Sequence, residues 1–466
     1  MKLTDVRGLA VSTQSAAALE HYELAAEQTH GYFGDPQASL DQALAEDPDF
    51  AAAHALRADL AVMSSEQGAL PSIQASADAL ERIGSRANAR ERAHVAAAQA
   101  WLEGRFELAA HRYGAIAIEH PRDLIAIQAA HAVDFYLGDS ILLRDRIAQA
   151  LPYWNQEVPG YGYLLGMHAF GLEETGNYGR AEDVGRHALA LNPRDACAVH
   201  AVEHVFEMQG RVHDGIEWLN ATAPNWTGGG FSVHLWWHLA LHQLELGDLP
   251  AALDVYDHLV HPKEVTAVSA LVDSTQLLAR LALRGGAVGT RWQALADCWS
   301  QTTEGGFFVF NDLHALLAYA LAGREQDIKR MLTAIEKSAR GIGTNAENVR
   351  AVGMPLALSI IAMAAGRSAE AVEQLLPIRS RSYRIGGSHA QRDLVQLTAI
   401  GAALAAGNGR LARALVSERT EVKPASPHNW RLMARALEAQ GATTEARKAS
   451  EHAELRRRAQ LRRTAA

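Results

Sequence analysis

Histidines spaced one helical turn apart are the residues of this chain that could do chemistry. His200 and His204 stand four residues apart in ACAVHAVEHVFEMQG, and His234, His238 and His242 follow at the same interval in FSVHLWWHLALHQLELG. Side chains four residues apart project from the same face of a helix, with Cβ atoms roughly 5–6 Å apart. Imidazoles at that spacing suit a metal ion, a general base or a polar ligand better than a dry core.

Five histidines are predicted to share one face of neighbouring helices. In helical repeats, the concave surface is where ligands usually bind. Counting back from the glycine that closes each helix places five imidazoles within a sector of roughly 100°, namely His200, His204, His234, His238 and His314. The alternative is that each is an ordinary groove or core residue, because the chain has 21 histidines and eight of them crowd between residues 196 and 262.

The string HAVEH, from His200 to His204, matches the inverted zincin pattern H-x-x-E-H. Two imidazoles one turn apart can hold Zn²⁺ while the intervening Glu203 activates water, but Glu203 projects about 100° away from His204. We therefore prefer a metal site of another composition. The residues predicted to hold a divalent ion such as zinc are His200, His204, His234 and Glu207.

A later segment, GGSHAQRDL, contributes an acid and a base at the start of a predicted helix. His389 and Asp393 are four residues apart and could pair, which would orient the imidazole as a general base. The alternative is a plain helix start with Ser388 as its cap. The predicted catalytic residues are His200, His204, His238, His389 and Asp393.

Substrate contacts are predicted from aromatic and charged residues beside these histidines. A tryptophan that faces a polar groove can stack on a planar ligand, although most tryptophans at helical spacing are core residues. The predicted substrate-binding residues are Trp226, Trp237, Asp312, His314 and Arg392. Asp312 also fits a first-turn helix charge, and Arg392 a surface ion pair. The loop APNWTGGGF is either a connector or a backbone that approaches a ligand closely.

Composition excludes several classes of function. The formal net charge is −9, so the sequence carries no basic field for nucleic acid, and the basic C-terminal segment is interpreted as a capping helix. No run of about 18 apolar residues occurs, so no membrane span is expected. The two cysteines, Cys197 and Cys298, are predicted to be buried free thiols, and the expected location is cytoplasmic.

The elements that must position these residues are helical hairpins. Glycines that close helical stretches recur every 34 to 43 residues from Gly68 to Gly441, a spacing that suits two antiparallel helices and their turns. Strand patterns are nearly absent. The sequence therefore predicts an all-α solenoid of tetratricopeptide-like hairpins in a right-handed superhelix. One repeat domain is expected over 1–466, with an N-terminal cap at 1–50, repeats at 51–441 and a capping helix at 442–466.

The chain resembles a known family in several stretches that run in order along almost its whole length. They include LAEDPDFAAAHAL, HPRDLIAIQAAHAVDFYLGD, NPRDACAVHAVEHVFEMQG, HLWWHLALHQLELGDLPAALDVYD, FNDLHALLAYALAG and GGSHAQRDLVQLTAIGAAL. They are similar to the tetratricopeptide repeat protein 38 family and its bacterial relatives. The resemblance implies the helical-repeat fold and leaves the chemistry open.

Two functions follow from these patterns. The first is a pocket for a small polar molecule, with a hydrolase-type reaction that uses acid–base or metal-assisted chemistry. The second is a non-catalytic scaffold that binds a peptide along its groove, the usual role of such repeats. Scarcity of lysine on the groove side of the central units argues for the pocket. The sequence predicts neither the identity of the ligand nor the oligomeric state.

Overall fold

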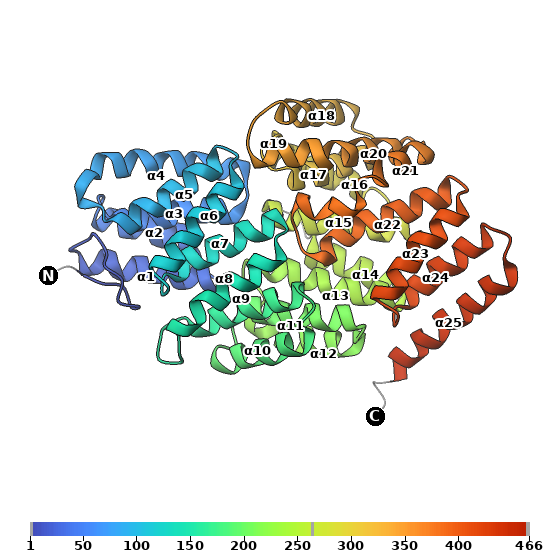
Figure 1. The fold of residues 1–466 in the computed structure, drawn as a ribbon, viewed down its shortest axis with the longest axis horizontal. Helices are drawn as coiled ribbons and strands as arrows, with labels where there is room; N and C mark the ends of the chain where they lie inside the picture. Colours follow the sequence, from blue (N-terminus) through green and yellow to red (C-terminus); the bar gives the residue numbers. More distant parts are fainter. Residues whose placement is uncertain (1–2, 262–264, 463–466) are drawn as a thin grey trace. The chain divides into compact units, whose positions relative to one another are not determined.

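The computed structural model describes residues 3–261 and 265–462. Within these residues the chain is helical throughout, and the only β-structure is an isolated bridge between Thr4 and Ala10. The predicted all-α fold is therefore confirmed. The α-helices, coloured along the chain in Figure 1, are α1 (Ala16–Gly31), α2 (Pro36–Glu46), α3 (Ala51–Ser64), α4 (Leu70–Ile83), α5 (Ala89–Leu102), α6 (Phe106–Glu119), α7 (Leu124–Leu137), α8 (Ser140–Ala150), α9 (Tyr161–Glu174), α10 (Tyr178–Leu191), α11 (Ala196–Gln209), α12 (Val212–Trp226), α13 (Ser232–Leu246), α14 (Leu249–Val255), α15 (Val268–Leu283), α16 (Arg291–Thr302), α17 (Val309–Leu321), α18 (Glu325–Ala339), α19 (Thr344–Asn348), α20 (Met354–Ala364), α21 (Ser368–Leu375), α22 (His389–Ala405), α23 (Gly409–Val422), α24 (Pro427–Glu438) and α25 (Thr443–Arg462).

Short 3₁₀ and π turns join or extend several of these helices. The 3₁₀ turns are η1 (Gln67–Ala69), η2 (Gly84–Arg86), η3 (Leu151–Tyr153) and η6 (Arg379–Ile385), and the π turns are η4 (Tyr256–Val260) and η5 (Val349–Gly353).

The chain divides into two compact units. The first comprises residues 1–202, 224–232 and 341–347, and the second comprises residues 203–223, 233–340 and 348–466. Within each unit, consecutive helices pack as neighbours, as α5, α6 and α7 do in the first and α22, α23, α24 and α25 do in the second (Figure 1). The single repeat domain expected from the sequence stays a prediction.

Glycine ends most of the first helices of the hairpins, as the sequence predicts. The closing glycines from Gly104 to Gly441 all have positive φ, a backbone conformation that glycine adopts without strain. Gly68 is the exception, because it lies inside η1 and α3 has already ended at Ser64. The prediction that Gly68 closes a helix is therefore wrong.

The segment expected to be a loop is partly helical. The APNW part of APNWTGGGF continues α12 to Trp226 with Pro224 inside the helix. The three glycines that follow Trp226 serve backbone packing in the first unit. Gly230 N–H donates to the Tyr32 carbonyl at 2.7 Å, and a Cβ on Gly229 would lie 2.6 Å from that oxygen. This close approach is to the protein itself, which explains the glycines without a ligand.

One helical stretch passes a length-and-composition test for a membrane span. Residues Thr344–Ala364 run through α19, η5 and α20 with a mean hydropathy of 1.2, and half of the apolar window is buried within the protein. Burial of that kind is typical of a core helix. The sequence-based expectation of no membrane partner stays a prediction.

The core of the first unit contains a buried charged network around His94 of α5. The imidazole Nδ1 lies 2.7 Å from Asp59 Oδ2 of α3, and Nε2 lies 3.0 Å from Asp123 Oδ2. Asp123 also accepts from Arg90 at 2.6 Å, and Tyr113 of α6 donates to Asp59 at 2.6 Å. Burial alone would lower the pKa of His94, but the two carboxylates raise the pKa to about 10.

The stability of the first unit is expected to fall as the pH rises above neutrality. An unfolded histidine has a pKa of about 6.5, so the raised pKa of His94 stabilises the fold fully below that pH, and this stabilisation is lost as the pH rises through about 10. The charged and titratable groups facing the imidazole are Asp59, Asp123, Tyr113 and Arg90. Urea unfolding at pH 6, 8 and 9.5 measures the effect. In His94→Gln the decline should be shallower, and an equal decline in both proteins would contradict the assignment.

Candidate functional site

Four imidazoles meet in the second unit. They are His204 of α11, His234 and His238 of α13, and His389, the first residue of α22. Ring centroids are 4.7 Å apart for His204 and His238, 4.9 Å for His234 and His238, and 5.2 Å for His204 and His389. His204 and His238 are fully buried, whereas His234 and His389 are partly exposed. We refer to these four residues as the histidine cluster.

Two carboxylates lie against Nδ1 nitrogens of the cluster. His234 Nδ1 is 2.9 Å from Asp273 Oδ2 of α15, and His238 Nδ1 is 3.4 Å from Glu207 Oε2 of α11. Glu207 is in turn held by Lys423, whose Nζ donates to Oε1 at 2.8 Å. An imidazole whose Nδ1 faces a carboxylate presents Nε2 to the other side, the arrangement that orients histidine ligands in metal sites.

Three imidazoles of the cluster are close enough to share one metal ion. One ring nitrogen from each of His204, His234 and His238 lies within 4.8 Å of the others. Three histidines that leave one position open are the protein ligands of many catalytic zinc sites. Glu207, predicted as a metal ligand, lies 3.4 Å from His238 Nδ1 and forms an ion pair with Lys423.

Helix packing and burial shape the electrostatics of the cluster. Trp237 is fully buried and stacks on His234, with ring centroids 5.2 Å apart and planes 15° apart. Its other neighbours include His238 at 4.8 Å and the guanidinium of Arg280 at 5.4 Å. Burial is the largest effect on His238 and lowers its pKa well below the ordinary value, so this imidazole is neutral at pH 7.

His242, the third histidine of α13, belongs to a separate pair. Its Nε2 lies against Glu203 Oε1 of α11, and both side chains are buried. Burial opposes protonation of His242, but the Glu203 carboxylate raises the pKa of the imidazole above its ordinary value. A Cβ on Gly215 of α12 would lie 2.1 Å from this ring, so glycine is needed for the close approach. Glu203, which would be the base of a zincin string, is thus paired with a histidine outside that string.

The expected pair of His389 and Asp393 is not formed. Asp393 binds Arg419 of α23 through both carboxylate oxygens instead. The local structure follows the alternative derived from the sequence, because Ser388 caps α22 and forms a capping box with Gln391. Asp393, which is half-buried one turn into α22, pairs with α23 because the guanidinium of Arg419 offers a charge-assisted, two-pronged partner.

His314 and Asp312 of α17 lie among buried polar contacts in the second unit. His314 Nδ1 donates to the Phe310 carbonyl at 2.7 Å, and Nε2 is 3.0 Å from Gln276 Nε2. Burial lowers the pKa of His314 to about 4 and raises the pKa of Asp312 to about 7, where the carboxyl accepts from Gly306 N–H at 3.0 Å. Both side chains are engaged with the protein itself.

The remaining predicted site residues are distributed between the units. His200 is buried in the first unit, with its ring 5.1 Å from those of Phe170 and Phe231, and Trp226 is buried in the same unit. Arg392 belongs to the second unit, where it contacts the Gly387 carbonyl. The two cysteines are free as predicted, but both are half-buried.

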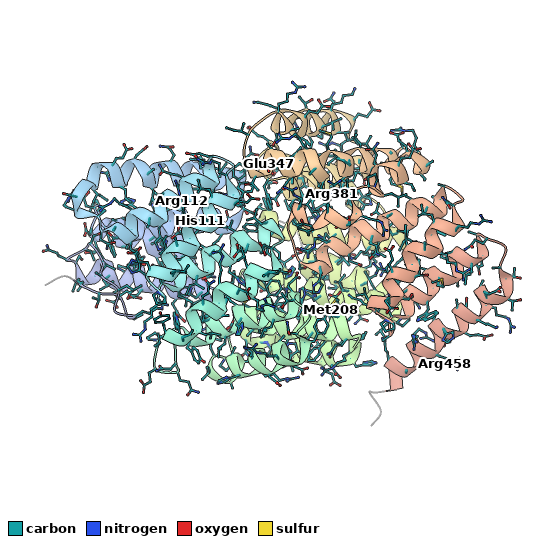
Figure 2. All side chains as sticks on the ribbon, in the orientation of Figure 1. His111, Arg112, Met208, Glu347, Arg381 and Arg458 are labelled. Carbon is teal, nitrogen blue, oxygen red and sulfur yellow. The ribbon has the colours of Figure 1, made fainter. Side chains whose placement is uncertain are left out.

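Two cavities lie in the second unit. An apolar cavity of about 250 Å³ is lined by α15, α17, α20 and α22, with Gln276, His314 and Gln391 among its few polar residues. A second cavity of about 310 Å³ is strongly charged and lined by α11, α13, α15, α22 and α23. Met208, labelled in Figure 2, lies on its wall. Glu207 lines the charged cavity and also faces His238 of the cluster.

Sequence reasoning missed the polar residues of α15. Asp273, Gln276 and Arg280 stand three and four residues apart in a mostly apolar helix, and all three are buried. Arg280 donates to Gln276 Oε1 at 2.8 Å and to the Ala390 carbonyl at 2.6 Å. This polar stripe was a readable signal, since buried charges are rare unless they are paired or functional.

Comparisons with known proteins find only distant likenesses to solved structures. No family model matches the chain. A solved structure of the human IFIT1 dimer with m7Gppp-AAAA is 15% identical and covers 97% of this chain and 91% of its own, with a TM-score of 0.37. The TPR domain of P58(IPK) is 12% identical and covers 81% of this chain and 97% of its own, with a TM-score of 0.22. Likenesses this distant carry no inference about ligands.

The helices, the glycine-closed turns and the absence of strands in the described residues define a tetratricopeptide-repeat-like, all-helical protein.

Proposed function

We propose that the second unit binds a divalent transition-metal ion through His204, His234 and His238 and uses it in a hydrolase-type reaction on a small polar molecule. The observation that supports this proposal is that two of the converging imidazoles each have a carboxylate beside Nδ1. Asp273 lies beside His234, and Glu207 lies beside His238. We also propose that the chain is a member of the tetratricopeptide repeat protein 38 family, on the motifs that resemble it.

The donor set suits zinc or a similar ion. Nitrogen ligands without a thiolate favour Zn²⁺, Co²⁺ or Ni²⁺ over hard ions such as Mg²⁺ and Ca²⁺. Such an ion, when bound with an open position, polarises a carbonyl or phosphoryl oxygen and activates water. His234 and His389 are the partly exposed members of the cluster, so the open position is proposed to lie on their side.

The residues of the chain have distinct roles in this proposal. Asp273 and Glu207 hold the imidazole rings in the orientation that directs the other nitrogen inward. His389, beside His204, is the residue proposed to move a proton. In the hydrolysis, the oxygen of water becomes bonded to the acyl or phosphoryl centre, the bond to the leaving group breaks, and the proton of water passes to the leaving group, so no redox partner is required.

Metal titration of the full-length protein tests the proposal. After chelation and dialysis, the protein is titrated with Co²⁺ and Zn²⁺. We expect about one ion per chain and, for Co²⁺, the intense visible absorption of a four-coordinate site. His258→Ala, which removes an exposed histidine of η4, should bind as the wild type does. Binding that is absent, or that is lost equally in this control, would overturn the proposal. A stoichiometric protein partner without metal binding would favour the scaffold instead.

A further inference from the structure

We infer that the charged cavity of the second unit is a binding site for a small oxyanion, a carboxylate or a phosphate, held by Arg280 and Arg284. The cavity has a volume of about 310 Å³ and is lined by the side chains of α11, α13, α15, α22 and α23. It adjoins the histidine cluster through Glu207, which lines the cavity and also faces His238, but the inference does not depend on the proposed metal site.

The charges that line the cavity do not cancel pairwise. Its cations are Arg280, Arg284, Arg419 and Lys423, and its carboxylates are Glu207, Glu245 and Asp393. Arg419 is paired with Asp393 and Lys423 with Glu207. Glu245 accepts hydrogen bonds from Ser426 Oγ and His428 N–H rather than from an arginine of the cavity. Within the residues that the structure describes, two guanidinium groups therefore remain without a carboxylate bonded to them.

Arg280 and Arg284 bond only to uncharged oxygens among the described residues. Arg280 is 2% exposed and donates to Gln276 and to the Ala390 carbonyl. Arg284, the C-cap residue that follows α15, donates to the Arg280 carbonyl at 3.4 Å, and its buried Nε has no hydrogen-bond partner in the described part of the chain. A buried charge is costly unless it is paired. Arg280 is buried, and Arg284 is half-buried with a buried Nε, so these two arginines lining one cavity indicate an anionic ligand.

The positive charge of Arg284 also acts on a buried histidine nearby. Burial lowers the pKa of His428, and the next largest effect comes from the positive charge of Arg284. Arg284 itself has its pKa lowered by burial to about 10, so it is still protonated at pH 7. The planar fork of a guanidinium matches two oxygens of a carboxylate or phosphate. The net excess of one cation over carboxylates in the lining suits a small anion rather than a polyanionic chain.

Calorimetric titration with inorganic phosphate and, separately, with succinate tests the site on the metal-free full-length protein. Saturable binding of either is expected. Arg284→Met keeps the apolar stem and should weaken binding by about 10- to 100-fold, as expected for loss of a charged hydrogen-bond donor. The affinity of Arg284→Lys for the anion should lie between those of the wild type and Arg284→Met. Glu245→Gln, which removes a repelling charge, should bind the anion more tightly than the wild type does.

The matched control is Arg291→Met, because Arg291 is paired with Asp257 and does not line the cavity. Circular dichroism establishes that each variant is folded. Tighter binding of phosphate identifies a tetrahedral oxyanion as the ligand class, and tighter binding of succinate identifies a carboxylate. If neither phosphate nor succinate binds saturably, or if Arg284→Met binds as tightly as the wild type, the inference is overturned. Because metal is removed first, failure of the metal proposal leaves this result unaffected.

Discussion

Replacing His238 with alanine is expected to weaken zinc binding by more than the roughly 10- to 100-fold that loss of an outer carboxylate typically costs. His238 is fully buried between His204 and His234, with ring centroids 4.7 and 4.9 Å away. Its loss would leave two of the three proposed ligands, and two imidazoles hold an ion far less tightly than three. Competition with a chromophoric chelator measures the affinity.

Asp273→Asn provides the graded comparison. The amide keeps the size of the carboxylate but removes the charge that faces His234 Nδ1 at 2.9 Å, so zinc affinity should fall by about 10- to 100-fold. Elemental analysis after gel filtration gives an independent readout for both variants. Equal zinc affinity in wild type, His238→Ala and Asp273→Asn would exclude the cluster as the metal site, wherever else zinc bound.

Replacing Asp123 with alanine is expected to lower the free energy of unfolding of the first unit by about 3–5 kcal/mol, the usual cost of removing one partner from a buried ion pair. The carboxylate binds Arg90 at 2.6 Å and His94 at 3.0 Å, and both partners are buried. Asp123 also caps α7 by accepting from Ala126 N–H at 3.0 Å. Urea denaturation followed by circular dichroism measures the change.

Two variants separate the cap from the charges. Asp139→Ala removes a similar cap at the start of α8, where the aspartate accepts from Leu142 N–H, and it should cost about 1 kcal/mol. Asp123→Asn keeps a good capping residue but removes the charge that Arg90 and His94 need. The loss of unfolding free energy in Asp123→Asn should lie closer to that in Asp123→Ala than to that in Asp139→Ala. A loss for Asp123→Ala no larger than that for Asp139→Ala would show that the network contributes little.

The helices and their boundaries follow from local properties of the sequence. The spacing of the closing glycines predicts the hairpins, and the structure differs mainly at Gly68 and in the helical part of APNWTGGGF. Ser388, which the sequence offers as a helix cap, caps α22 in the structure. Such features depend on residues within a few positions of one another, so the sequence is enough to place them.

The sequence also placed His204, His234 and His238 on corresponding helical faces, and in the structure these three rings are in contact. The partners of those rings depend on which helices pack together and at what rotation. Asp273 is 39 residues from His234, and Lys423 is 216 residues from Glu207. The same long-range packing pairs Asp393 with Arg419 and Glu203 with His242.

The sequence by itself therefore determined an all-helical repeat chain with imidazoles at turn spacing, because hydrogen bonding between residues four apart fixes which side chains share a face. Only the tertiary structure decided which carboxylates orient those imidazoles, and that Arg280 and Arg284 at the end of α15 line a cavity without a bonded carboxylate among the described residues. Those relationships join residues that are distant along the chain, and they are set by how helix surfaces interlock rather than by any local periodicity.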